Sequence, residues 1–226
     1  MTASLVPLML RVLPLALGSA LSPIILALQM LTLTSGTRRQ LRAWLVALGA
    51  AVACGGWVVV GLLVVNRMPH PAHGPDPTGG AARIALALLL VSLGAKALYH
   101  RNPDAPPAQA VDVSEEGSAH LLRAVLLGFA AMLSNVSSLV LFLPALHEIT
   151  HARTDDMTRS IVLGVLILIT LLPALVPPLA AAIGGADARR ALDRLSAVIA
   201  AHHTTINATI CFVFATYLVA TGVTRL

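Results

Sequence analysis

Residues His147 to His151 read His-Glu-Ile-Thr-His, a spacing that can bind a metal ion. On a helix the two histidines lie four residues apart on one face, and they could hold a zinc ion for which Glu148 acts as general base. The site needs a third ligand, and the connections predicted on the same side offer Asp155, Asp156, His70 and His73. The motif is short and the chain has eight histidines, so a chance match is the competing interpretation.

A polar pair interrupts the first apolar run, which extends from about Leu5 to Leu33. A helix of that length would be roughly 43 Å long, whereas the hydrocarbon of a bilayer is roughly 30 Å thick. Ser22-Pro23 lies near its middle, and proline removes a backbone donor, so we expect the helix to break there. Lipid tolerates freed backbone groups only where protein or a water-lined cavity satisfies them, which makes the break a candidate binding site. The alternative is a proline kink without a ligand.

The second half of the chain has a similar interruption. A shift of about 112 positions aligns Ser22 with Ser134 and Pro23 with Asn135. Paired interrupted helices in two halves of a chain point to a transport site at the membrane midplane. We therefore predict that Ser22, Pro23, Ser134 and Asn135 line a substrate site.

Three further polar residues lie inside the last apolar run, where they must find partners in a helix bundle. They are His202, His203 and Asn207. We predict that they complete the substrate site, and hydrogen bonding between helices is the alternative.

The composition is that of an integral membrane protein: 57% of the 226 residues are hydrophobic and 11% are charged, and the mean hydropathy is +0.85. We predict an all-α fold with six transmembrane helices, in which the first and fourth are broken. An odd number of helices in each half would make the halves inverted repeats, residues 1–100 and 121–226, joined by a disordered loop at 101–120. The expected spans are Leu5–Leu33, Ala43–Val65, Ala82–Tyr99, Leu121–Leu143, Ser160–Ile183 and Leu195–Val223.

The charged residues suggest an orientation and a class of cargo. All ten acidic residues fall in expected connections or at helix edges, which argues against proton-coupled export of cations. The basic groups nearest the hydrocarbon are Arg11, Lys96 and Arg123, which could hold an anionic head group or extend to the interface. Nine basic residues on one side against six on the other place both termini outside. Basic loops that face anionic lipid account for the net charge of +5, so we predict no binding of nucleic acid.

Small residues in the second span follow a spacing of four, as in Gly49 with Ala53 and Ala51 with Gly55. Such faces let helices approach closely in lipid. Tight packing within the chain is one interpretation, and a homodimer is the other.

Several short stretches resemble one protein family. They are similar to the actinobacterial GAP branch of the lysine-exporter superfamily, the glycopeptidolipid- and sulfolipid-addressing proteins. In the fourth span that family usually has Asn-Pro-Lys, whereas Val136 and Ser137 follow Asn135 here, so a role for that lysine does not carry over. The stretches are 16–23 with Arg38-Arg39, 93–98 with 101–103, 127–135, and 207–210.

The resemblance implies six helices in the plasma membrane and a role in moving or presenting large envelope lipids, beside lipid-synthesising acyltransferases and a lipid exporter. Our first hypothesis is accordingly a transporter or translocation accessory for an anionic or glycosylated envelope lipid, which needs no cofactor. The second is a membrane-embedded zinc enzyme that acts on an envelope lipid through His147, Glu148 and His151. The third is a small-solute exporter of the amino-acid type.

Overall fold

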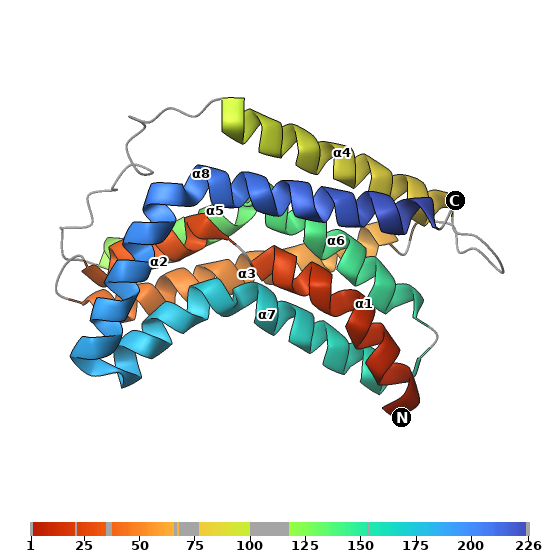
Figure 1. Ribbon diagram of the computed structural model, residues 1–226. Coiled ribbons are helices and arrows are strands. Elements are labelled where there is room, and N and C mark those ends of the chain that lie inside the picture. The colour runs from red at the N-terminus through yellow and green to blue at the C-terminus, as the bar shows by residue number, and fades with distance from the viewer. Residues whose placement is uncertain are drawn as a thin grey trace.

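The computed structural model describes residues 2–20, 22–34, 38–65, 67, 77–99, 118–152 and 154–224 (Figure 1). Within those ranges the chain forms eight helices and no strand. The helices are α1 (Thr2–Ala20), α2 (Pro23–Thr34), α3 (Arg39–Val65), α4 (Pro77–Tyr99), α5 (Ser118–Leu133), α6 (Val136–His151), α7 (Asp156–Ile183) and α8 (Gly185–Val223). Most of the predicted central loop, residues 101–117, lies outside the described residues.

Both expected breaks are present. The axes of α1 and α2 meet at 52°, and those of α5 and α6 meet at 68°. Over the described residues, four single helices are long and apolar enough to cross a membrane, and the number is six if each bent pair forms one span. The all-helical membrane architecture is therefore confirmed, with breaks in the first and fourth expected spans.

Two expected helix boundaries are wrong. The fourth span was expected to end at Leu143, but α6 continues through Pro144 to His151. Pro144 lacks an N–H but does not end this helix. Proline is tolerated inside a membrane helix where the surrounding protein satisfies the freed carbonyl, and Pro144 is buried. The last helix begins at Gly185 rather than near Leu195, so Arg190 and Arg194 belong to α8 and not to a connection.

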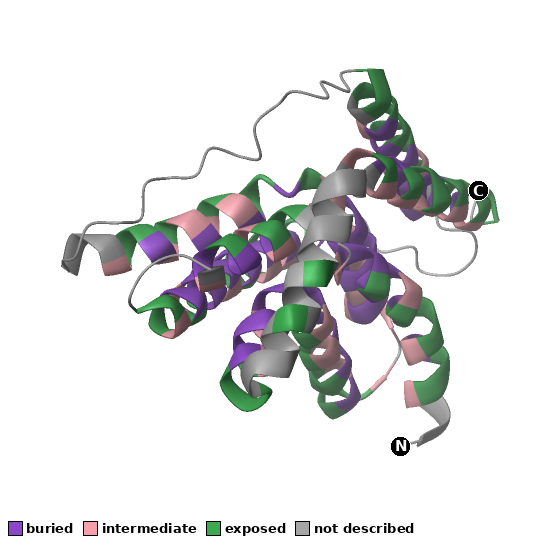
Figure 2. Ribbon diagram, turned by 60° about the vertical axis from the view of Figure 1, so that its left-hand side comes forward, coloured by how far each residue is buried: buried purple, intermediate pink, exposed green. Residues whose placement is uncertain are grey.

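The helices turn their buried positions inward (Figure 2). Many large hydrophobic side chains are exposed on the outer surface. α4 packs along α8, α3 along α5, and α1 against both α6 and α7. An apolar outer surface fits surroundings of lipid, in which large exposed hydrophobic side chains carry no penalty. Examples of such exposed residues are Leu10, Val52, Val60, Leu88 and Leu168.

Two glycines allow α3 and α5 to approach to backbone contact. A Cβ atom built on Gly49 would collide with the carbonyl oxygen of Val125, and one built on Gly128 would collide with the carbonyl oxygen of Val46. Each helix thus presents a glycine to the backbone of the other. Around Gly55 no atom of another element lies within 4 Å of the added Cβ. The small residues of α3 therefore lie on two faces, one packed against α5 and one open.

α7 continues through three prolines and changes direction near its middle (Figure 1). Pro178 has no N–H, so the carbonyl of Ala174, four residues earlier, lacks its helical donor. The side chain of Gln29 on α2 replaces that donor: its Nε2 donates to the Ala174 oxygen at 2.8 Å and to the Ala43 oxygen at 3.1 Å. Gln29 is fully buried and joins α2 to α3 and α7.

Gln29→Leu should lower the free energy of unfolding by about 1–2 kcal/mol, because the Ala174 carbonyl would then be buried without a donor. The Oε1 atom of Gln29 has no partner among the described residues, so its removal offsets part of the loss. Chemical denaturation in detergent, followed by circular dichroism, would measure the change. Gln40→Leu is the matched control, since Gln40 donates to the Pro178 carbonyl, which does not face a proline four residues later. An equal loss in both variants would contradict this account.

Candidate functional site

Ser22 forms the start of α2 after the first break. Its Oγ accepts a hydrogen bond from the backbone N–H of Ile25 at 3.4 Å, which is the position of a helix N-cap. Pro23 follows as the first helical residue, where its fixed φ suits a helix start and its missing N–H costs nothing. Ser22 is 1% exposed, so this cap lies inside the protein.

Asn135 has the same role at the second break. Its Oδ1 accepts from the backbone N–H of Ser138 at 3.4 Å and from the hydroxyl of Ser137 at 3.0 Å. It therefore caps the N-terminus of α6, and it is 4% exposed.

The two caps are hydrogen-bonded to each other, although they lie 113 residues apart. Nδ2 of Asn135 donates to Oγ of Ser22 at 2.7 Å. The N-termini of α2 and α6 consequently meet inside the bundle. Each N-terminus carries the positive end of a helix dipole, which favours negatively charged or strongly polar ligands.

Further neutral polar groups lie on the same helices. The hydroxyl of Ser138 in the first turn of α6 is buried and has no partner among the described residues. Ser19, in the last turn of α1, has its Oγ 2.7 Å from Oγ1 of Thr170 on α7. Chemically, this set of groups can donate and accept hydrogen bonds, but it contains no nucleophile paired with a base.

The structure brings together only part of the predicted substrate site. Ser22 and Asn135 are in contact, whereas Ser134 is exposed at the kink. Asn135, rather than Ser134, thus plays the capping role that Ser22 plays in the first half. The two caps are 113 residues apart, one more than the shift of 112 positions used to align the halves. Pro23, His202, His203 and Asn207 lie in helices, but their side chains fall outside the described residues.

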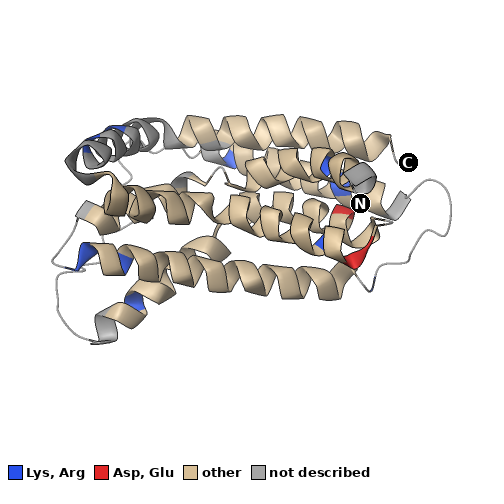
Figure 3. Cartoon of the chain, turned by 90° about the horizontal axis from the view of Figure 1, so that it is seen from below, with Lys and Arg blue, Asp and Glu red and all other residues tan. Residues whose placement is uncertain are grey.

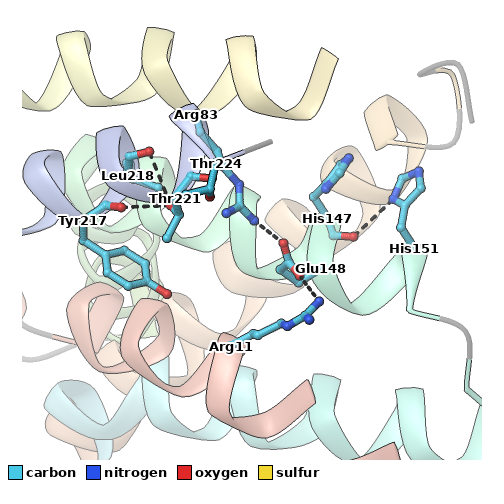
Figure 4. Close-up of polar contacts among 9 residues, drawn as sticks. All are labelled: Arg11, Arg83, His147, Glu148, His151, Tyr217, Leu218, Thr221 and Thr224. Atoms are coloured by element: carbon cyan, nitrogen blue, oxygen red, sulfur yellow. Dashed lines mark hydrogen bonds and ion pairs between the residues drawn. The ribbon is translucent and has the colours of Figure 1, made fainter. Parts of the chain in front are cut away.

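The His-Glu-Ile-Thr-His motif lies in the last turns of α6 (Figure 4). The rings of His147 and His151 stack with their centroids 4.2 Å apart, and Nδ1 of His151 is 3.1 Å from the carbonyl oxygen of His147. Both histidines lie on the helix that the motif requires, which begins well before them and contains Pro144.

Glu148 lies in the last turn of α6, as expected for an acidic residue at a helix edge, but its side chain is buried. Oε1 of Glu148 accepts a hydrogen bond from Nη2 of Arg83 on α4, and the two side chains are each 6% exposed. Oε2 lies 3.9 Å from Nη1 of Arg11 on α1. Two guanidinium groups therefore engage the carboxylate that the zinc-enzyme hypothesis assigns as general base (Figure 4).

The proposed third metal ligands are engaged elsewhere or lie outside the description. Asp155 caps α7: the hydroxyl of Thr158 donates to it at 2.8 Å and the Thr158 N–H at 3.0 Å. These bonds hold the pKa of Asp155 below its ordinary value of 3.8. Asp156 pairs with Arg159 at 3.4 Å, and His70 and His73 fall outside the described residues. In the part of the chain that is described, no three metal-ligating side chains gather.

Charge is distributed unevenly between the two ends of the bundle (Figure 3). The acidic side chains that are described, Glu148, Asp155 and Asp156, lie at the end where the chain begins and finishes. Several arginines gather at the opposite end with no described acidic side chain among them. The first turns of α3, α5 and α8, which lie at that end in Figure 1, carry or adjoin Arg38, Arg39, Arg42, Arg123, Arg190 and Arg194.

Sequence reasoning missed Arg83 and Gln29. Arg83 is a lone arginine near the start of an apolar run, and that position was the only signal of a buried partner. Gln29 is likewise the one amide in its apolar run, five residues before α2 ends at Thr34.

Comparison with known proteins identifies one family. The family model described as Sap, sulfolipid-1-addressing protein, matches residues 12–224. No curated protein and no solved structure matches the chain.

Proposed function

Because the chain belongs to the sulfolipid-1-addressing protein family, we propose that it moves or presents an anionic or glycosylated lipid of the cell envelope. The observation that carries this proposal is the hydrogen bond between Ser22 and Asn135, where the N-termini of α2 and α6 meet. Two helix N-termini supply a positive potential to a polar head group inside the bundle, without a charged side chain. Pro23, Ser134, His202, His203 and Asn207 remain candidates for lining the same path.

We further propose that α1 to α4 and α5 to α8 are inverted repeats. In such repeats α1 to α4 correspond to α5 to α8 in order. In support, the contact of α3 with α5 has its counterpart in that of α7 with α1, and the contact of α2 with α7 has its counterpart in that of α6 with α3. Interrupted helices at equivalent positions of such repeats are common where a transporter holds its substrate. The arginine-rich end would face the cytoplasm of a plasma-membrane protein, with both termini outside.

The zinc-enzyme alternative gains no support from this geometry, since two arginines already engage Glu148. The small-solute alternative gains none either, because the family match concerns a lipid-addressing protein. An acyltransferase and a lipid exporter remain the predicted partners.

Asn135→Ala should reduce export of the envelope lipid at least tenfold in cells, because it removes the bond to Ser22 and loosens the start of α6. It should also lower the free energy of unfolding by about 1 kcal/mol, as expected for loss of an N-cap. Lipid appearing at the cell surface, normalised to the amount of protein in the membrane, is the measurement. Export comparable to wild type would contradict the proposed site.

Asp155→Ala is the matched control for this variant. Asp155 also caps a helix, with the same spacing of three residues to its N–H donor, but it lies away from the two breaks. We expect the two variants to lose similar stability while only Asn135→Ala loses export. A parallel loss of export in Asp155→Ala would assign the effect to folding alone.

A further inference from the structure

Arg11 is an exposed cation on α1 with unused hydrogen-bond donors. Its side chain is 67% exposed, and its polar contact among the described residues is the ion pair with Glu148 at 3.9 Å. That distance is longer than a hydrogen bond, so the guanidinium N–H groups of Arg11 remain available. Val6, Leu10 and Leu17 are also exposed on α1, on a neighbouring face about 100–140° around the helix from Arg11.

The buried pair behind Arg11 sets the charge of this position. Arg83 binds Oε1 of Glu148 closely, which leaves the more distant Oε2 to face Arg11 (Figure 4). Without Arg83, the Glu148 carboxylate would repel an approaching anion and would take Arg11 for itself. With it, the three side chains carry one net positive charge, which one negatively charged group would neutralise.

We propose that Arg11, supported by the buried Arg83–Glu148 pair, binds the oxyanion of a lipid head group such as a sulfate or phosphate ester. A guanidinium group matches such an oxyanion with two parallel hydrogen bonds, which a lysine could not supply. The position lies at the end of the bundle that holds both termini, so it is distinct from the meeting point of α2 and α6. The inference rests on the proposed function in that it names the head-group chemistry of the lipid.

The test is binding of a sulfated glycolipid to the purified full-length protein in detergent, with the same glycolipid lacking its sulfate as the uncharged probe. Wild type should prefer the sulfated form, and Arg11→Gln should weaken binding of that form about tenfold or more. Arg11→Lys should keep part of the affinity, because it keeps the charge but not the paired donors. Arg11→Gln should fold normally, since an exposed ion pair contributes little stability.

Arg38→Gln is the matched control, because it removes an exposed arginine that directly precedes α3, at the end of the bundle away from both termini (Figure 1). Its affinity for the sulfated glycolipid should equal that of wild type. Equal loss in Arg11→Gln and Arg38→Gln, or unchanged binding in Arg11→Gln, would overturn the proposal. Equal affinity of the wild type for the two glycolipids would also overturn it.

Two further measurements follow. The first distinguishes a free oxyanion from a lipid head group as the ligand, and the second distinguishes the Arg11 site from the meeting point of α2 and α6. If inorganic sulfate at constant ionic strength displaces the glycolipid only when Arg11 is present, the site takes the free oxyanion as well as the lipid. If sulfate does not displace it, the site takes the lipid alone. Asn135→Ala should leave the dependence on Arg11 unchanged, so failure of the transport site and failure of this head-group site give different results.

Discussion

Replacing Gly49 or Gly128 by alanine should destabilise the protein by about 1–3 kcal/mol at each site. The added Cβ would collide with a backbone carbonyl of the facing helix, at Val125 or Val46 respectively, and a backbone cannot rotate away as a flexible side chain can. The sign of this effect is informative, because alanine favours a helix over glycine by about 1 kcal/mol. The steric cost must therefore exceed a gain in helix propensity, and the double variant should separate α3 from α5.

Gly55 and Gly56 supply the control within the same helix, since no atom lies within 4 Å of a Cβ built on either. Gly55→Ala and Gly56→Ala should be neutral or slightly stabilising. Thermal unfolding in detergent, followed by circular dichroism, would measure all four variants. If Gly49→Ala proved as stable as Gly55→Ala, the close approach of α3 and α5 would be incorrect. If the exposed pair were instead the sensitive one, a contact between two copies of the chain would explain it.

Glu148→Gln should lower the free energy of unfolding by about 3–5 kcal/mol, the usual cost of removing one partner from a buried ion pair. Glutamine preserves the shape of the side chain but removes the negative charge that offsets Arg83 in the interior. The double variant Arg83→Met with Glu148→Gln should recover much of the loss, because it leaves no uncompensated charge there. Arg11→Gln should cost less than about 1 kcal/mol, since Arg11 is mostly exposed.

The Glu148 series distinguishes a structural carboxylate from a catalytic one. If Glu148 were a general base beside zinc, Glu148→Gln would remove the activity while the fold stayed intact. A double-mutant cycle compares wild type, Arg83→Met, Glu148→Gln and the double variant. Their free energies of unfolding give the coupling energy between Arg83 and Glu148 directly. The ion pair would be contradicted if Glu148→Gln were as stable as wild type and the effects of the two single substitutions simply added in the double variant.

The breaks in α1–α2 and α5–α6 could be predicted from the sequence because their signals are local. An apolar run that is too long for the membrane must tilt or break, and Ser-Pro and Asn are typical residues at the start of a helix. The resemblance to the sulfolipid-addressing proteins could likewise be read from short stretches, two of them at those breaks, and the family match over residues 12–224 confirms that family.

Other parts of the site depend on tertiary geometry that periodicity does not encode. Arg83 and Glu148 are 65 residues apart, and their pairing depends on how far α4 and α6 rotate about their axes. Whether Ser134 or Asn135 caps α6 depends on the residue at which the backbone leaves the preceding helix. Gln29 matters because Pro178, on another helix, leaves a carbonyl without a donor. A single sequence carries no signal for such pairings.

The polar groups described around the meeting of α2 and α6 are all neutral, and this has an electrical consequence. They are Ser19, Ser22, Gln29, Asn135, Ser138 and Thr170. Moving one elementary charge through a membrane potential changes its energy by about 2.3 kcal/mol per 100 mV. Rearrangement of these side chains moves no net charge through that field. These six groups therefore add no voltage dependence of their own to translocation. An outward-moving sulfate ester would be driven by an inside-negative potential, whereas an uncharged glycolipid would not respond to it.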